Sequence, residues 1–227
     1  MGVAWLDEMV PPFRVAPRDR GLIDLDAHWW AHSTVRVGLH LDLRHDRFSS
    51  GLRRTGPGDL RFHTLVEPGA GRAQGAASPG ERAPGRLGLG WQVKLPNAEE
   101  DEELGTDETD VSIWGQGRLP LGPGELRARA GLAILGHPLQ LANQDDVPLT
   151  DVSYRLPLGE VWLEGSMGGS WRTPRNPARH ELGLAVEAGC PLRMGASADL
   201  GLTPAAPLWS ARAWLGWAGP CFEAARD

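Results

Sequence analysis

Hydrophobic and polar residues alternate along much of this chain with a period of two, most regularly from Ile23 to Leu43. Odd positions there carry mainly aliphatic residues, alanine and tryptophan, whereas even positions carry most of the aspartate, histidine and arginine. A period of two predicts β-strand with one apolar and one polar face. The segment is about twice as long as a membrane-spanning strand, so we expect a hairpin with a three-residue loop at 32–34, which keeps the flanking residues on one face.

The same alternation recurs in later segments and predicts an all-β chain. The regular segments are 87–95, 110–119, 126–134, 161–169, 181–188, 193–200 and 209–217, and the weaker ones are 60–66 and 152–156. The total is about eleven strands. Because bacterial barrels usually have an even number, either a twelfth strand lies in residues 8–16 or one strand is split or merged.

Short turns and longer loops alternate between these segments. The short turns are expected at 121–124, 157–160 and 188–191, and the longer polar loops at 45–58, 97–109, 137–148 and 172–179. Short turns at one end and long loops at the other are typical of outer-membrane barrels, with the long loops outside. The segment 67–84, rich in Gly, Pro, Ala and Ser, breaks this alternation.

Alternation alone does not distinguish a soluble sandwich from a membrane barrel, because both have one apolar face. Several runs are longer than the usual strand of about five or six residues. Tryptophans lie on the apolar parity, several near strand ends, as an interfacial girdle requires: Trp29, Trp91, Trp171, Trp209 and Trp217. We therefore expect an antiparallel up-and-down transmembrane β-barrel of about 12 strands, and of at least about 10. It would span residues 20–219, between an N-terminal segment, 1–19, that could hold a first strand, and a C-terminal tail, 220–227.

Charge and hydropathy disfavour two classes of protein. The net charge of −6 leaves no basic face for nucleic acid. The longest uncharged stretch, 130–144, is too short for a transmembrane helix and contains His137 and Pro138. The residues from Met1 to Glu8 lack the basic and long apolar regions of a signal peptide. That feature favours the alternative, a soluble Gly-rich β-sandwich or barrel that acts as a binding or structural module.

The polar face of a barrel would line its lumen, and nine candidate lumen residues follow from the parity. They are Asp24, Asp26, His28, His40, Arg127, Arg129, Glu164, Glu181 and Glu187, with the two arginines as candidate partners of the three glutamates. His28, His32 and His40 share this parity. A metal or proton-relay role is open to them, but we expect ordinary hydrogen bonds to nearby carboxylates.

Other features of the sequence are weaker indications of a functional site. The acidic run 99–103 could hold a divalent cation, but it lacks the ligand spacing of a calcium loop, so we expect a solvated loop. The chain has no G-x-S-x-G nucleophile motif, and we expect neither enzymatic activity nor a cofactor. Cys190 and Cys221 could form a disulfide or remain free thiols. Lys94 is the only lysine, which we interpret as compositional bias.

Several short motifs resemble a known family. The sequence KLP at 94–96 is followed by a loop and by LGTDETD at 104–110, GPGDL stands at 56–60, and GLTPAAP stands at 201–207. These pieces are similar to the outer-membrane family named for the phenol-degradation meta-pathway, over about residues 20–218. The resemblance implies a β-barrel in the bacterial outer membrane and a transporter or channel for a small solute. Its partners would then be the lipid bilayer and lipopolysaccharide, and we expect a monomer.

Overall fold

The computed structural model describes residues 19–47, 51, 53–68, 85–96, 109–135, 145–173, 177–189, 192–206 and 208–217. These residues form one antiparallel sheet in which each strand pairs with the next along the chain. The strands are β1 (Asp19–His32), β2 (Val35–Arg47), β3 (Arg53–Val66), β4 (Arg86–Leu95), β5 (Asp110–Leu121), β6 (Gly124–Leu135), β7 (Asp145–Leu158), β8 (Val161–Ser170), β9 (Arg179–Ala188), β10 (Leu192–Gly201) and β11 (Trp209–Trp217). The expected all-β, antiparallel, up-and-down fold is confirmed, with eleven strands among the described residues. The predicted twelfth strand at 8–16 lies outside them.

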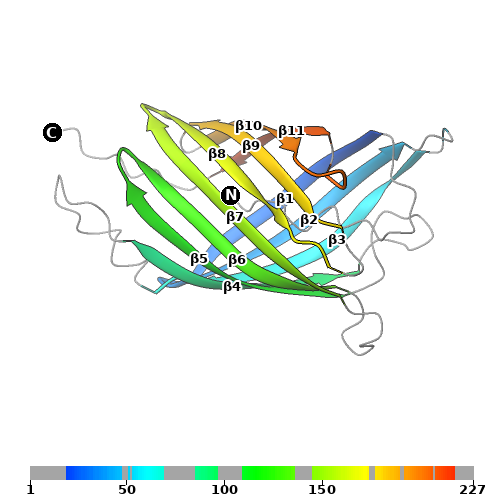
Figure 1. The fold of residues 1–227 in the computed structure, drawn as a ribbon, viewed down its shortest axis with the longest axis horizontal. Helices are drawn as coiled ribbons and strands as arrows, with labels where there is room; N and C mark the ends of the chain where they lie inside the picture. Colours follow the sequence, from blue (N-terminus) through cyan, green and yellow to red (C-terminus); the bar gives the residue numbers. More distant parts are fainter. Residues whose placement is uncertain are drawn as a thin grey trace.

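The sheet is strongly curved, so that β1, β2 and β3 pass behind the strands of the near wall (Figure 1). Arg36 on β2 interacts electrostatically with Arg118 on β5 and Arg127 on β6, so these three side chains lie on the same, inner face of the curved sheet. No hydrogen-bonded pairing joins β1 to β11 within the described residues. Each strand is antiparallel to the next, and an odd number of strands lies between β1 and β11. These two edge strands therefore run in the same direction.

The first hairpin keeps the predicted parity by a different local geometry. β1 and β2 are joined by a two-residue turn at Ser33 and Thr34 rather than by a three-residue loop. A bulge between Trp30 and His32 adds the missing residue, so the pairing from Asp19↔Arg47 to Trp30↔Arg36 has the register that a three-residue loop would give. Apolar residues of both strands therefore share one face.

Two loops predicted from glycine, proline and charge are shorter than expected. β2 and β3 continue to pair as far as Arg47↔Arg53, across a bulge that takes up Gly58 and Asp59, so most of the predicted loop 45–58 is strand. β7 begins at Asp145 and pairs with β6 along its length, so the loop expected at 137–148 ends earlier. The motif at 56–60 thus lies within β3 and does not open it. Ladder hydrogen bonds to a neighbouring strand outweigh the local turn signals at these positions.

The tight turns and the longer connections lie at opposite ends of the strands. The tight turns β1–β2, β5–β6 and β7–β8 lie at one end, at the left of Figure 1, and the connections after β2, β4, β6, β8 and β10 lie at the other. The turns expected at 121–124 and 157–160 are confirmed as two-residue turns at 122–123 and 159–160. The connection from β3 to β4 is the long exception at the tight-turn end, as the sequence indicates.

Burial is inverted relative to an ordinary water-soluble sheet. Large apolar side chains on the outer face are exposed, for example Leu87 at 76% and Leu215 at 70%, whereas charged side chains on the inner face are buried, for example Asp59 and Glu67 at 2% each. The apolar core is a small cluster of Ala133, Val147 and Leu149. The alternation in the sequence therefore separates an apolar outside from a polar inside.

The predicted positions of the tryptophans follow this division. Trp29, Trp91, Trp171 and Trp209 are exposed, as their apolar parity predicts, and the side chain of Trp217 lies outside the described residues. Trp114 instead points to the inner face, where Gly90 leaves room for its ring and Gly131 leaves room for its Cβ atom. The polar face of the sheet therefore also contains a large aromatic ring, which packs against a glycine.

Candidate functional site: the polar inner face

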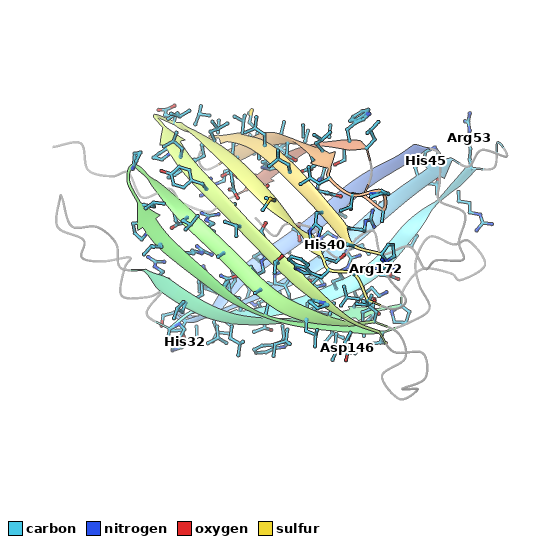
Figure 2. The ribbon with its side chains drawn as sticks, in the orientation of Figure 1. His32, His40, His45, Arg53, Asp146 and Arg172 are labelled. Atoms are coloured by element: carbon cyan, nitrogen blue, oxygen red, sulfur yellow. The ribbon has the colours of Figure 1, made fainter. Side chains whose placement is uncertain are left out.

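The inner face is assembled by register, because antiparallel pairing brings polar residues of successive strands into rows. One row runs across five strands as Asp26↔His40, His40↔Arg61, Arg61↔Lys94 and Lys94↔Asp110. Residues directly opposite in such a ladder have their Cβ atoms about 4.5–5.5 Å apart, close enough for oppositely charged side chains to pair. On β2 this row lies about midway along the strand, where His40 is seen between His32 at one end and His45 at the other (Figure 2), and it reaches the last residues of β4 and the first residue of β5.

Lys94 is at the centre of a buried ion-pair group. Its Nζ lies 2.5 Å from a carboxylate oxygen of Asp110 and 3.5 Å from one of Asp59, and the lysine and Asp59 side chains are almost fully buried. Two carboxylates beside one ammonium compensate the loss of its hydration. The only lysine of the chain therefore has a structural partner set, which its interpretation as compositional bias did not foresee.

Glu67, at the end of β3, connects that strand to β5. Its carboxylate accepts a hydrogen bond from Gln116 at 3.1 Å and lies 3.4 Å from the guanidinium of Arg118. Its own backbone N–H donates to the carbonyl of Thr34 at 2.8 Å, which holds it against the β1–β2 turn. A buried carboxylate held by two side chains from β5 fixes the inner face near the tight-turn end.

Arginines of β6 point into the same interior. Arg127 lies 2.5 Å from Glu125 and 3.8 Å from Glu164, so its predicted pairing with Glu164 is present, with Glu125 closer. The guanidinium of Arg129 lies 5.9 Å from the centre of the Trp114 ring, and it interacts electrostatically with Asp151 and Glu164. These cations face a neighbouring carboxylate and do not form a patch of one sign.

The far side of the interior has the same character. Glu187 on β9 pairs with Arg155 at 2.9 Å and with Arg193 at 3.5 Å, and not with the predicted Arg127 or Arg129. The reason is the strand order, because β7 and β8 lie between β6 and β9 in the sheet. Asp199 on β10 pairs with Arg212 at 3.1 Å and accepts a hydrogen bond from Ser210 at 3.2 Å.

Histidines form a second kind of contact on β1–β3. His40 Nδ1 lies 3.0 Å from Asp26 Oδ1, which is the hydrogen bond to a carboxylate expected for this residue. His28 Nδ1 instead lies 3.1 Å from Nε2 of His63, a contact that the sequence did not suggest. His32 lies at the turn, where its ring contacts Thr34 at 3.1 Å.

The predicted lumen residues divide into three groups. The structure places Asp26, His28 and His40 together on β1–β2 and Arg127, Arg129 and Glu164 together on β6–β8, as described above. Glu187 belongs to a separate group with β7 and β10, and Glu181 is half-buried on β9. Asp24 lies in β1 opposite Asp42, and its side chain is outside the described part of the chain. That these residues line a conducting lumen remains a prediction.

Several inner-face residues were missed, although the parity contains a signal for them. In β3 the outward residues from Leu60 onward are even-numbered, since Leu39 pairs with Phe62, so Arg61, His63 and Glu67 point inward. The same reading applies to other charged residues of the polar parity: Lys94, Arg118, Asp151, Arg155, Asp199 and Arg212. Asp59 has the same parity, but it lies in the bulge of β3, just outside the segment 60–66 that the pattern predicts as strand.

The sequence comparisons give no relative. No protein-family model matches the chain, and no curated protein matches it either. Among the described residues, no helix is long and apolar enough to cross a membrane. Within the same residues, no group of three or more His, Cys, Asp or Glu side chains is placed to hold a metal ion. Cys190, Cys221 and the acidic run 99–103 lie outside the part of the chain that the structure describes.

Proposed function

We propose that this chain is a β-barrel of the bacterial outer membrane that passes small polar solutes along its charged inner face. The observation that carries the proposal is the inverted burial of the sheet, with apolar side chains outside and ion pairs inside. Every strand except β6 exposes at least one large apolar side chain. A soluble monomer rarely exposes an apolar patch of more than a few hundred Å², whereas a lipid-facing band requires one.

The dimensions of the strands agree with this role. The strands run from 9 to 14 residues. A tilted strand needs about 9–11 residues to cross the hydrocarbon core of a bilayer. Exposed Trp29, Trp91 and Trp209 supply rings of the kind that gather at the edges of such a band.

A membrane barrel must leave no strand edge unpaired in lipid, since an unpaired backbone group there has no water to bond to. β1 and β11 run in the same direction, so antiparallel closure needs one further strand between them. A total of about 12 strands follows, and residues 8–16 stay our predicted source of that strand. In this arrangement the end with the tight turns faces the periplasm, and the end with the longer connections faces outward, toward lipopolysaccharide.

The inner face indicates what kind of pore this would be. Many of its charged side chains are buried, and both signs are present in close pairs, as at Lys94–Asp110 and Arg155–Glu187. A barrel of about 12 strands is intermediate between one of about eight strands, which side chains fill, and one of about 16–18 strands, which leaves a wide aqueous channel. We therefore expect a narrow path with little preference between cations and anions. The resemblance to the outer-membrane family also favours a transport role.

The test is refolding of the urea-denatured full chain into detergent micelles and lipid vesicles. A membrane barrel runs at a different position on a gel when it is not boiled, and it conducts ions in small, discrete steps across a planar bilayer. We expect both behaviours. A protein that folds without detergent, shows no heat-dependent gel shift and stays out of vesicles would contradict the membrane location. A heat-dependent shift without conductance would contradict only the transport role.

A further inference from the structure

The contact between His28 and His63 has an unusual origin in the register of the first three strands. His28 on β1 lies opposite Gly38 on β2, and Gly38 lies opposite His63 on β3. The two histidines are therefore separated by a whole strand, about 10 Å across the sheet. Their rings meet above the middle strand, with the ring centres 4.9 Å apart.

Gly38 makes this contact possible. A Cβ atom added at Gly38 would collide with the ring of His63 and with Nδ1 of His28. The neighbouring inward positions of β2 are Arg36 and His40, so the glycine is a gap in a row of large polar side chains. Both rings lean into that gap from opposite sides.

The facing nitrogens have the spacing of two ligands on one metal ion. His28 Nδ1 and His63 Nε2 are 3.1 Å apart. Nitrogens bound to one zinc ion at about 2.0–2.1 Å, with an angle of about 90–109° between them, lie about 2.8–3.4 Å apart. Without a metal, only one of these nitrogens can carry the shared proton, and the other accepts it. A bound cation would use the lone pairs of both.

The surrounding charges are balanced around the pair. Asp26 is within electrostatic reach of both rings, and so is the guanidinium of Arg36, which offsets it. Asp26 is hydrogen-bonded to His40 and is thereby held beside the pair. No third ligand completes a set among the described residues. The remaining coordination positions would therefore be taken by water or by an exchangeable solute.

We propose that His28 and His63 form a two-histidine site for a divalent transition-metal ion on the inner face of the sheet. Imidazole ligands suit copper, zinc and nickel, and affinity along this series is highest for Cu²⁺. The site depends on the pairing of β1, β2 and β3 and does not require that the barrel conduct.

The test uses Cu²⁺ added to the refolded full-length protein in detergent, followed by electron paramagnetic resonance. We expect splitting from two imidazole nitrogens at one equivalent of copper. His28→Asn and His63→Asn should each reduce the affinity for copper by about 10- to 100-fold or more. Loss of a group that only orients a metal ligand already lowers metal affinity by about 10- to 100-fold. Gly38→Ala should also weaken binding, although it keeps both histidines, because the added methyl group separates the rings.

The matched control is His45→Asn, which removes a histidine of β2 that bonds to Thr55 near the other end of the strand. It should leave copper binding unchanged. Unchanged affinity in both the His28 and the His63 variants would overturn the proposal. So would a spectrum of the parent protein without two imidazole nitrogens, a result that does not depend on how the variants fold. The heat-dependent gel shift, measured on the same samples, tests the membrane barrel separately.

Discussion

At the scale of single residues, the buried charges of the inner face are held by specific partners. Lys94 shows this most clearly, since two carboxylates approach one ammonium group that has little contact with solvent. Removing one member of a buried pair leaves an uncompensated charge, which costs about 3–5 kcal/mol, whereas an exposed pair contributes about 1 kcal/mol or less.

We therefore expect Lys94→Ala to lower the free energy of unfolding by about 3–5 kcal/mol, because Asp59 and Asp110 would be left side by side. The matched control is Arg193→Ala, since the Arg193 side chain is 48% exposed and Glu187 keeps Arg155 as a partner. That change should cost about 1 kcal/mol or less. Urea unfolding in detergent, followed by tryptophan fluorescence, measures both variants. Equal losses in the two variants would contradict the account.

The residues of the site were predictable as far as the parity was regular. Asp26, His40, Arg127 and Glu164 follow from period two alone, and the structure brings the predicted pair Arg127–Glu164 within 3.8 Å. The partners of Glu187 did not follow, because they depend on which strands are neighbours and in what register. The His28–His63 contact needs the register of three strands at once, which no local pattern contains.

At the scale of strands, glycines on the two faces of the sheet have different roles. A Cβ atom at inward Gly131 would collide with Trp114 and with the backbone of Ile113, whereas one at outward Gly115 would meet nothing within 4 Å. The inward glycine is required by packing. The outward glycine is a position where a side chain is free to extend into the surroundings.

This contrast gives a matched pair of variants on adjacent strands. Gly131→Ala should destabilise the protein by about 1–3 kcal/mol, as expected for overpacking. Gly115→Ala should leave stability unchanged or raise it by up to about 1 kcal/mol, because alanine restricts the unfolded chain. The urea midpoint, at an unchanged slope, reports the difference. Similar destabilisation by both changes would mean that the two glycines do not lie on opposite faces.

Strand positions were predictable where both faces followed the pattern, as in 87–95 and 126–134. They were not predictable at the ends of β2, β3 and β7, where Pro57, Gly58 and Pro148 read locally as loop. Pro148 lies one residue beyond the last pair of β7 with β8, Leu149↔Ser170, and its carbonyl accepts a hydrogen bond from the backbone N–H of Trp171 directly after β8. A proline, which has no N–H to donate, is compatible with strand at such an end of a ladder. Only the pairing of neighbours reveals where the ladders end.

At the scale of the whole molecule, the central claim is that the outer face meets lipid and the inner face does not. β10 allows a test with small residues, because Ala196 and Ala198 are exposed on the outer face and Ser197 between them is half-buried on the inner face. Their cross-strand neighbours confirm the faces, since Ala196 lies opposite Val186 and Ser197 lies opposite Arg212.

The most direct measurement is the accessibility of a nitroxide spin label at each of these positions in turn. The labels would be attached to single cysteines in a background with Cys190 and Cys221 changed to serine, and the protein would be refolded into vesicles. The account predicts that labels at 196 and 198 collide with oxygen dissolved in the bilayer and are shielded from a water-soluble nickel complex. The label at 197 should be much less accessible to oxygen than its neighbours. Accessibility to the nickel complex at 196 and 198, or no alternation along the three positions, would contradict the claim.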